Sequence, residues 1–212
     1  MTIQSYADLQ SAVGAWLKRP DLIASQVPNF IMLAEQLFER KIFTRARRAN
    51  YTTTPTDSLV ELPSDWCKII RAYYNGRTLP FFPNDLESSY AGGPNNAIRF
   101  GYQLQGDNMT LSVSGNSTGF GNNNDGLLVP GVLSIDYYTV LESLSTANTS
   151  NWLLEDAPDL YLAGALFEGF MYVRDAQNAS FWQGRRDQAI QDLIDDDSFS
   201  RTPEQPLVRR RA

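Results

Sequence analysis

The sequence contains no histidine, and Cys67 is its single cysteine among 212 residues. Without histidine the chain cannot form a Ser-His-Asp triad, and without a second cysteine it cannot form an internal disulfide. The His and Cys ligands of ordinary zinc sites are also missing. No apolar run approaches the roughly 20 residues that a membrane-spanning helix needs, and the first residues lack the pattern of a signal peptide. We therefore expect a cytosolic, soluble protein in which any catalysis would depend on carboxylates.

The overall composition is that of an ordinary globular protein. Apolar residues make up 42% of the chain and charged residues 20%, which argues against wholesale disorder. A chain of this length can bury a sizeable core, as one domain or two small ones.

Charge is distributed unevenly, although the formal net charge is only −6. Residues 1–48 carry seven basic and four acidic side chains, whereas residues 151–197 carry three basic and ten acidic ones. Residues 198–212 are again basic, with four arginines against one glutamate. Nucleic-acid binding draws its affinity from clustered Lys and Arg, so an acidic body with basic ends is not typical of it. The pattern fits either an ordinary acidic protein or a surface that DNA passes without binding.

The N-terminal segment, residues 1–47, has the pattern of two amphipathic helices. Ser5 is placed to cap the first helix, and Pro20 ends it. Pro28 suits the first turn of the second helix, where a missing N–H costs nothing. We expect Glu35 to fall mostly off the apolar stripe of this helix. We expect four apolar residues at helical spacing to lie on the inner face of the first helix: Leu9, Val13, Trp16 and Leu17.

The helical pattern returns at residues 151–197. Pro158 marks the start of a helix with a broad apolar face, and Asp175–Asn178 is predicted to break it. The helix after this break is predicted to end at Asp195–Asp197, where negative charge opposes the helix dipole and favours fraying. Its expected inward residues are Phe181, Trp182, Ala189, Ile190, Leu193 and Ile194.

The middle of the chain, residues 48–142, alternates like short antiparallel strands. Asn75-Gly76 lies between two such runs and predicts a hairpin with a type I′ turn. The Gly/Asn-rich stretch 114–125 is predicted to be a loop. The predicted fold is therefore α+β: a helical bundle from the N- and C-terminal helices, an inserted small antiparallel β domain, and an extended basic tail at 198–212.

Carboxylates are the only groups here that suggest catalysis, and their positions favour structural roles. Glu168 lies within an apolar helix, either at the edge of the buried face or paired with Arg71 or Arg174. The remaining candidates lie at helix ends, where capping or solvation explains them: Glu155, Asp156, Asp159, Asp192 and Asp195–Asp197. We predict no catalytic, cofactor-binding or metal-binding residues, and no cofactor.

The C-terminal tail has the chemistry of a docking peptide. It joins an apolar pair to three arginines, and such a segment can lie along a partner while its arginines bind carboxylates. A solvated basic tail or a nonspecific nucleic-acid contact explains the same residues equally well. The residues in question are Leu207, Val208, Arg209, Arg210 and Arg211.

Three stretches resemble the head–tail adaptor proteins of tailed phages. The most specific is Asn151–Glu168, with the sequence NWLLEDAPDLYLAGALFE. The opening helices from Tyr6 to Glu35 and the turn Leu62–Trp66 are similar to the same family. Together the likeness spans most of residues 5–195.

This resemblance implies a non-enzymatic structural protein of the virion, made in the host cytoplasm and placed at the head–tail junction. Adaptors of this kind form a ring, usually of twelve copies, between the portal protein and a tail or nozzle protein. The ring extends the channel through which double-stranded DNA passes without sequence-specific binding. The resemblance also implies that Leu207, Val208 and Arg209–Arg211 dock on the portal. The basic segment 40–48 would face the acidic 151–197 block of a neighbouring copy or pair within its own subunit.

Two other functions are compatible with the residues. One is a carbohydrate- or protein-binding β-domain module of a phage tail accessory protein. Its stacking face would be formed by Tyr73, Tyr74, Phe81, Phe82, Tyr137 and Tyr138. The other is a carboxylate-dependent hydrolase that would use Glu168, Asp156 and Asp159.

Overall fold

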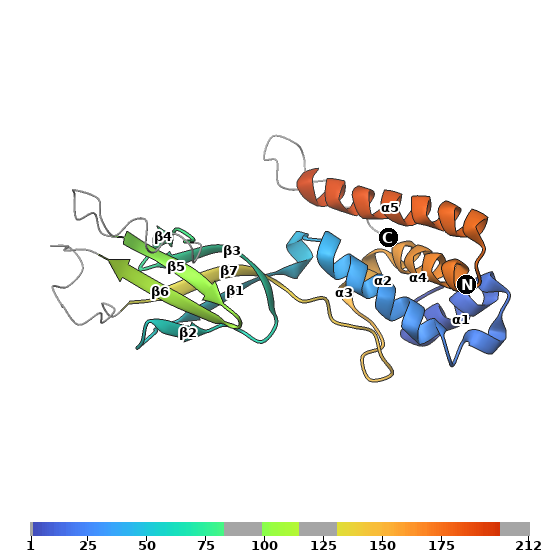
Figure 1. Ribbon diagram of the computed structural model, residues 1–212, viewed down its shortest axis with the longest axis horizontal. Helices are drawn as coiled ribbons and strands as arrows, with labels where there is room; N and C mark the ends of the chain where they lie inside the picture. The colour runs from blue at the N-terminus through green and yellow to red at the C-terminus, as the bar shows by residue number, and fades with distance from the viewer. Residues whose placement is uncertain (1, 83–98, 115–130, 200–212) are drawn as a thin grey trace. The chain divides into compact units, whose positions relative to one another are not determined.

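The computed structural model describes residues 2–82, 99–114 and 131–199. The chain divides into two compact units. A helical unit takes its residues from both ends of the chain, up to Arg47 and from Leu141 onward, and a β unit comprises residues 48–140. Figure 1 shows the helices in the blue and orange-to-red ends of the chain and the strands in the green and yellow middle. The predicted α+β class is confirmed.

The described residues of the helical unit form five α-helices and two 3₁₀ turns. The turns are η1 (Pro20–Leu22) and η2 (Arg45–Arg47). The α-helices are α1 (Tyr6–Leu17), α2 (Val27–Lys41), α3 (Trp152–Asp156), α4 (Pro158–Tyr172) and α5 (Ala176–Phe199).

The helix starts follow from short polar side chains and prolines. Ser5 Oγ accepts a hydrogen bond from the backbone N–H of Asp8 at 3.2 Å, and Asn151 Oδ1 accepts one from Leu154 at 2.9 Å. Both bonds satisfy N–H groups that have no partner within the helix. A proline occupies the first turn of both α2 and α4.

Helix α4 lies at the centre of the helical unit, where α1, α2 and α5 all pack against it. Its small residues allow this close approach. A Cβ placed on Gly164 would lie 2.6 Å from Phe38 Cζ and 3.0 Å from Ala34 Cβ on α2. A Cβ on Gly169 would lie 2.7 Å from a methyl carbon of Leu17 on α1. The glycines of α4 thus set the distance to two neighbouring helices.

The described part of the β unit contains two antiparallel sheets that share one hydrophobic core. One sheet has the order β1-β7-β3-β4 and the other the order β2-β6-β5. Asn75 and Gly76 turn β3 into β4 with φ values of 47° and 77°, as the predicted hairpin requires. The strands are β1 (Arg48–Thr53), β2 (Leu59–Glu61), β3 (Trp66–Tyr74), β4 (Arg77–Leu79), β5 (Arg99–Gln105), β6 (Asn108–Ser114) and β7 (Leu133–Thr139).

The C-terminal helix differs from its prediction at both ends. Asp175 accepts a hydrogen bond from the backbone N–H of Asn178 at 3.1 Å, so α5 begins at Ala176 and the predicted break shrinks to a short turn. The predicted fraying at the last aspartates is also wrong. The side chain of Asp197 is buried and accepts a hydrogen bond from the backbone N–H of Arg45 at 2.8 Å. This tertiary contact extends the helix to Phe199 despite the unfavourable dipole.

Two further expectations are corrected at the boundaries and in the core. Glu35, expected on the polar side of α2, is only 5% exposed. The predicted β segment ran to residue 142, whereas the β unit ends at Val140 because Leu141 is buried in the helical core. Residues 115–125 of the predicted loop and residues 200–212 of the predicted tail lie outside the described residues. Among the described helices, none combines the length and apolar character required to cross a membrane.

Candidate functional site

A buried polar network begins at Glu35 on α2. Its Oε1 accepts hydrogen bonds from the backbone N–H of Leu144 at 2.8 Å and from the Tyr161 hydroxyl at 3.1 Å. Asn151 Nδ2 donates to the Tyr161 hydroxyl at 2.7 Å and to the carbonyl of Glu142 at 2.6 Å. Burial raises the pKa of Glu35, and the bonds that its carboxylate accepts counteract this in part. The network fastens the segment before α3 to the helices.

One turn further along α2, Glu39 holds both chain segments that lead to the β unit. Its Oε1 accepts from Arg47 Nη2 at 2.8 Å, and its Oε2 accepts from the backbone N–H of Leu141 at 2.8 Å. Arg47 is only 1% exposed, and its Nη1 also donates to the carbonyls of Glu39 and Ile42. These partners are structural groups of the fold, and their hydrogen bonds position the two chain segments.

Glu168, the most unusual acid of the sequence, is half-buried and lies near Arg186. Burial raises its pKa and the positive charge of Arg186 lowers it. Arg186 stacks over the Phe167 ring, 4.5 Å from its centroid, and forms an ion pair with Asp187 at 2.9 Å. The partial burial of Glu168 agrees with the predicted position at the edge of the buried face, and among the described residues the charge that acts on it is that of Arg186 rather than of Arg71 or Arg174.

The described carboxylates do not form a metal-binding group. Asp156 and Asp159, proposed with Glu168 for a hydrolase, lie on the short helix α3 and in the first turn of α4. Within the parts of the chain that are described, no group of three Asp, Glu or Cys side chains is placed to hold a metal ion.

An aromatic cluster on the surface joins the end of α1 to the start of α5. Trp182 is mostly buried, and the rings of Trp16 and Phe181 pack edge-to-face against it with centroids 5.4 Å and 5.3 Å away. Trp16 is 56% exposed and Phe181 is 58% exposed. The expectation that both lie on the inner face is wrong, because the core positions beside them are already filled by Leu17 and Trp182.

Other apolar side chains of the helical unit are exposed on different helices. Met32 and Leu33 are 47% and 42% exposed on α2, and Met171 and Tyr172 are more than half exposed at the end of α4. Large exposed apolar groups that gather on a surface are typical of protein interfaces. The helical unit therefore presents the aromatic cluster and further exposed apolar side chains, which are Met32 and Leu33 on α2 and Met171 and Tyr172 at the end of α4.

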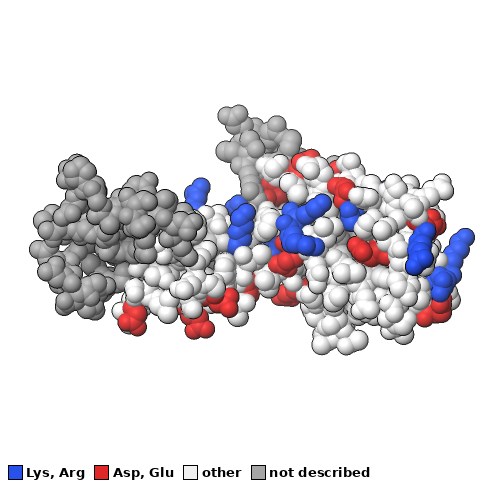
Figure 2. All heavy atoms as spheres, in the orientation of Figure 1, with Lys and Arg blue, Asp and Glu red and all other residues white. Residues whose placement is uncertain are grey.

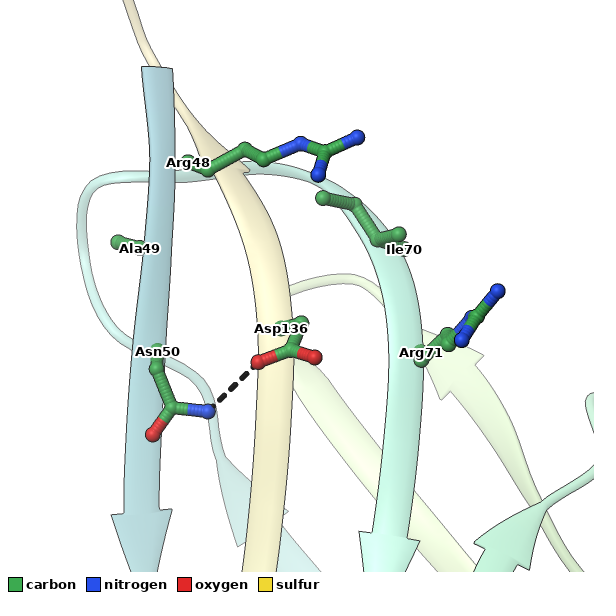
Figure 3. Close-up of a pocket in the computed structure, with 6 residues that line it drawn as sticks. All are labelled: Arg48, Ala49, Asn50, Ile70, Arg71 and Asp136. Atoms are coloured by element: carbon green, nitrogen blue, oxygen red, sulfur yellow. Dashed lines mark hydrogen bonds between the residues drawn. The ribbon is translucent and has the colours of Figure 1, made fainter. Parts of the chain in front are cut away.

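The outer face of the four-stranded sheet carries a shallow hollow of about 470 Å³, drawn in Figure 3. Asn50 Nδ2 donates to Asp136 Oδ1 at 2.7 Å across β1 and β7. The guanidinium of Arg48 lies over the Tyr138 ring, 5.7 Å from its centroid, and a hydrogen bond with the Tyr73 hydroxyl raises the pKa of Arg71. This hollow offers polar and cationic groups but no arrangement of a nucleophile and a base.

The aromatic stacking face of the alternative binding module is not formed as expected. Tyr74, Tyr137 and Tyr138 are buried, at 1%, 5% and 8% exposure. Phe81 is 52% exposed, but its ring packs against Tyr102 at 5.5 Å between centroids. Half of the six proposed aromatic side chains therefore belong to the interior. The proposed portal-docking residues, Leu207, Val208 and Arg209–Arg211, lie outside the described residues.

A helical body with exposed apolar side chains and an inserted β unit is compatible with a structural protein that assembles with other proteins. The comparison with family models makes this specific, because the model described as SU10 adaptor protein matches residues 4–210. The chain belongs to this phage head–tail adaptor family and is a structural protein of the virion. A search of curated proteins found no match.

Proposed function

We propose that the protein forms a ring between the portal and a tail or nozzle protein at the head–tail junction. The ring, expected to contain twelve copies, extends the channel for double-stranded DNA and provides the surface on which the tail docks. Membership of the adaptor family over residues 4–210 carries this proposal. The net charge of −6 suits a channel that DNA must pass without binding, because it repels phosphate.

The helical unit supplies the contacts between copies in this proposal. A closed ring is built from head-to-tail contacts, in which two different surfaces of one subunit meet. The helical unit has exposed apolar side chains on different helices, namely the aromatic cluster on α1 and α5 and the residues Met32 and Leu33 on α2. Each is small, but a ring repeats the contact at every subunit boundary.

The C-terminal residues provide the anchor on the portal. Leu207 and Val208 supply apolar contacts, and Arg209–Arg211 supply charge-assisted hydrogen bonds to carboxylates of the portal. Phe199 is the last residue of α5, so a chain that ends there keeps every described helix intact. This makes a truncation of residues 200–212 a clean test of the anchor.

The test mixes the purified protein with the portal protein of the same phage and measures the mass of the complex. We expect a stoichiometric ring on the portal, a weaker complex for the chain truncated after Phe199, and loss of the ring for Trp16→Ser with Phe181→Ser. The exposed pair Leu59→Ser and Val140→Ser on the β unit is the matched control. Unchanged binding by the truncated chain would refute the anchor, and the absence of any complex would refute the adaptor ring.

A further inference from the structure

The structure separates the basic segment at the end of α2 into an internal and an external part. Arg47 is buried and paired with Glu39 within its own chain. Arg40, Lys41 and Arg45 are exposed. Arg40 Nε donates only to the carbonyl of Gln36 at 2.9 Å, and within the described residues none of these three side chains forms an ion pair. We call Arg40, Lys41 and Arg45 the basic cluster.

A pair of carboxylates on α5 has the complementary chemistry. Asp192 and Asp195 are exposed, and each accepts a hydrogen bond at 2.8 Å from a glutamine four residues earlier, Gln188 or Gln191. These bonds orient the carboxylates without neutralising them, and among the described residues neither forms an ion pair. Both lie in the C-terminal half of α5. We call Asp192 and Asp195 the acidic pair.

The basic cluster and the acidic pair lie towards the same end of the helical unit. The bond from the backbone N–H of Arg45 to Asp197 Oδ1 joins the segment after α2 to the last turn of α5. Figure 1 shows the two helices finishing close to each other, and in Figure 2 basic and acidic side chains gather there. A head-to-tail contact in a ring joins two different surfaces of one subunit, and the basic cluster and the acidic pair carry opposite charges.

We infer that the basic cluster of one copy binds the acidic pair on α5 of the neighbouring copy. This inference rests on the proposed ring and names the polar part of its subunit contact. Each exposed ion pair contributes little alone, but the pairs are repeated around the ring and fix which surfaces meet. The contact should therefore weaken with salt, because exposed charges are screened.

The test uses charge reversal in two separate chains. One variant carries Arg40→Glu and Lys41→Glu, and the other carries Asp192→Lys and Asp195→Lys. The control, Arg71→Glu with Arg77→Glu on the β unit, changes the net charge by the same amount as the first variant. Association is measured by sedimentation velocity, alone and on the portal, at about 50 and about 500 mM salt.

Each variant alone should associate about tenfold or more weakly than wild type at low salt, with an unchanged melting temperature. An equal mixture of the two variants should recover association, because each Glu cluster then meets a Lys pair on the other chain. The control should behave as wild type. A single chain that carries all four substitutions should also recover association, because its Glu cluster then meets the Lys pair of an identical neighbour.

Three results would overturn the inference. If each of the two charge-reversal variants, tested alone, associated as strongly as wild type, the basic cluster and the acidic pair would not be in contact. The proposed ring would not be affected by that result. Recovery in the fourfold variant but not in the mixture would place the contact within one chain. Failure of the wild-type protein to assemble, alone or on the portal, would refute the proposed ring and with it this contact.

Discussion

Replacement of Glu35 should test whether the buried network holds the helical unit together. In Glu35→Ala the backbone N–H of Leu144 and the hydroxyl of Tyr161 lose their common acceptor, in a site where Glu35 itself is 5% exposed. A buried donor without a partner costs about 1–3 kcal/mol. We therefore expect the free energy of unfolding to fall by about 2–5 kcal/mol. Tyr161→Phe removes one donor and should cost less.

The pH dependence of this network has a definite sign. Burial raises the folded-state pKa of Glu35 above its unfolded value. The carboxyl group therefore contributes stability that is complete below the unfolded pKa and is lost as pH rises through the folded pKa. Glu35→Gln keeps an acceptor oxygen but does not titrate. The stability of wild type relative to Glu35→Gln should thus be greatest in acid and should decrease towards neutral pH.

The assay is urea unfolding followed by far-ultraviolet circular dichroism, which reports the helices, between about pH 4 and pH 8. A double-mutant cycle of Glu35→Ala and Tyr161→Phe, each of which removes the hydrogen bond between the two side chains, should give a coupling energy of about 0.5–3 kcal/mol. Additive effects would refute the proposed hydrogen bond. If the stability of wild type increased relative to that of Glu35→Gln as the pH rises, the assigned direction of the pKa shift would be refuted.

Two further predictions concern the same unit and use the same unfolding assay. Arg47→Met should lower stability by about 2–4 kcal/mol, because the carboxylate of Glu39 and two carbonyls lose a buried donor; an unchanged midpoint would contradict this. Gly164→Val should lower the free energy of unfolding by about 1–3 kcal/mol, because its side chain clashes with Phe38. Gly184→Ala is the control, since no atom lies within 4 Å of its new Cβ, and it should stabilise α5 by up to about 1 kcal/mol.

Local signals in the sequence were sufficient for the order and type of the elements. Ser5 caps α1, Pro158 begins α4, and Asn75-Gly76 forms its hairpin, because each depends on backbone chemistry within a few residues. The family resemblance, carried mainly by Asn151–Glu168, is likewise confirmed. The portal-docking role of the C-terminal residues stays a prediction.

Which side chains are exposed and which are buried depended on tertiary packing. Helical periodicity placed Trp16 and Phe181 inside, yet both are exposed, since an aromatic side chain has the same pattern in a core and at an interface. The sequence predicts Glu35 mostly off the apolar stripe, but contacts with residues more than a hundred positions away bury it. The sequence left open whether the basic segment 40–48 pairs within its own subunit or with a neighbour, and Arg47 pairs within its own chain. Sequence determined which segments become helices and strands, because those preferences are local. Tertiary structure alone decided which charges are paired internally and which are available to a neighbour, because burial depends on residues that are distant in the chain.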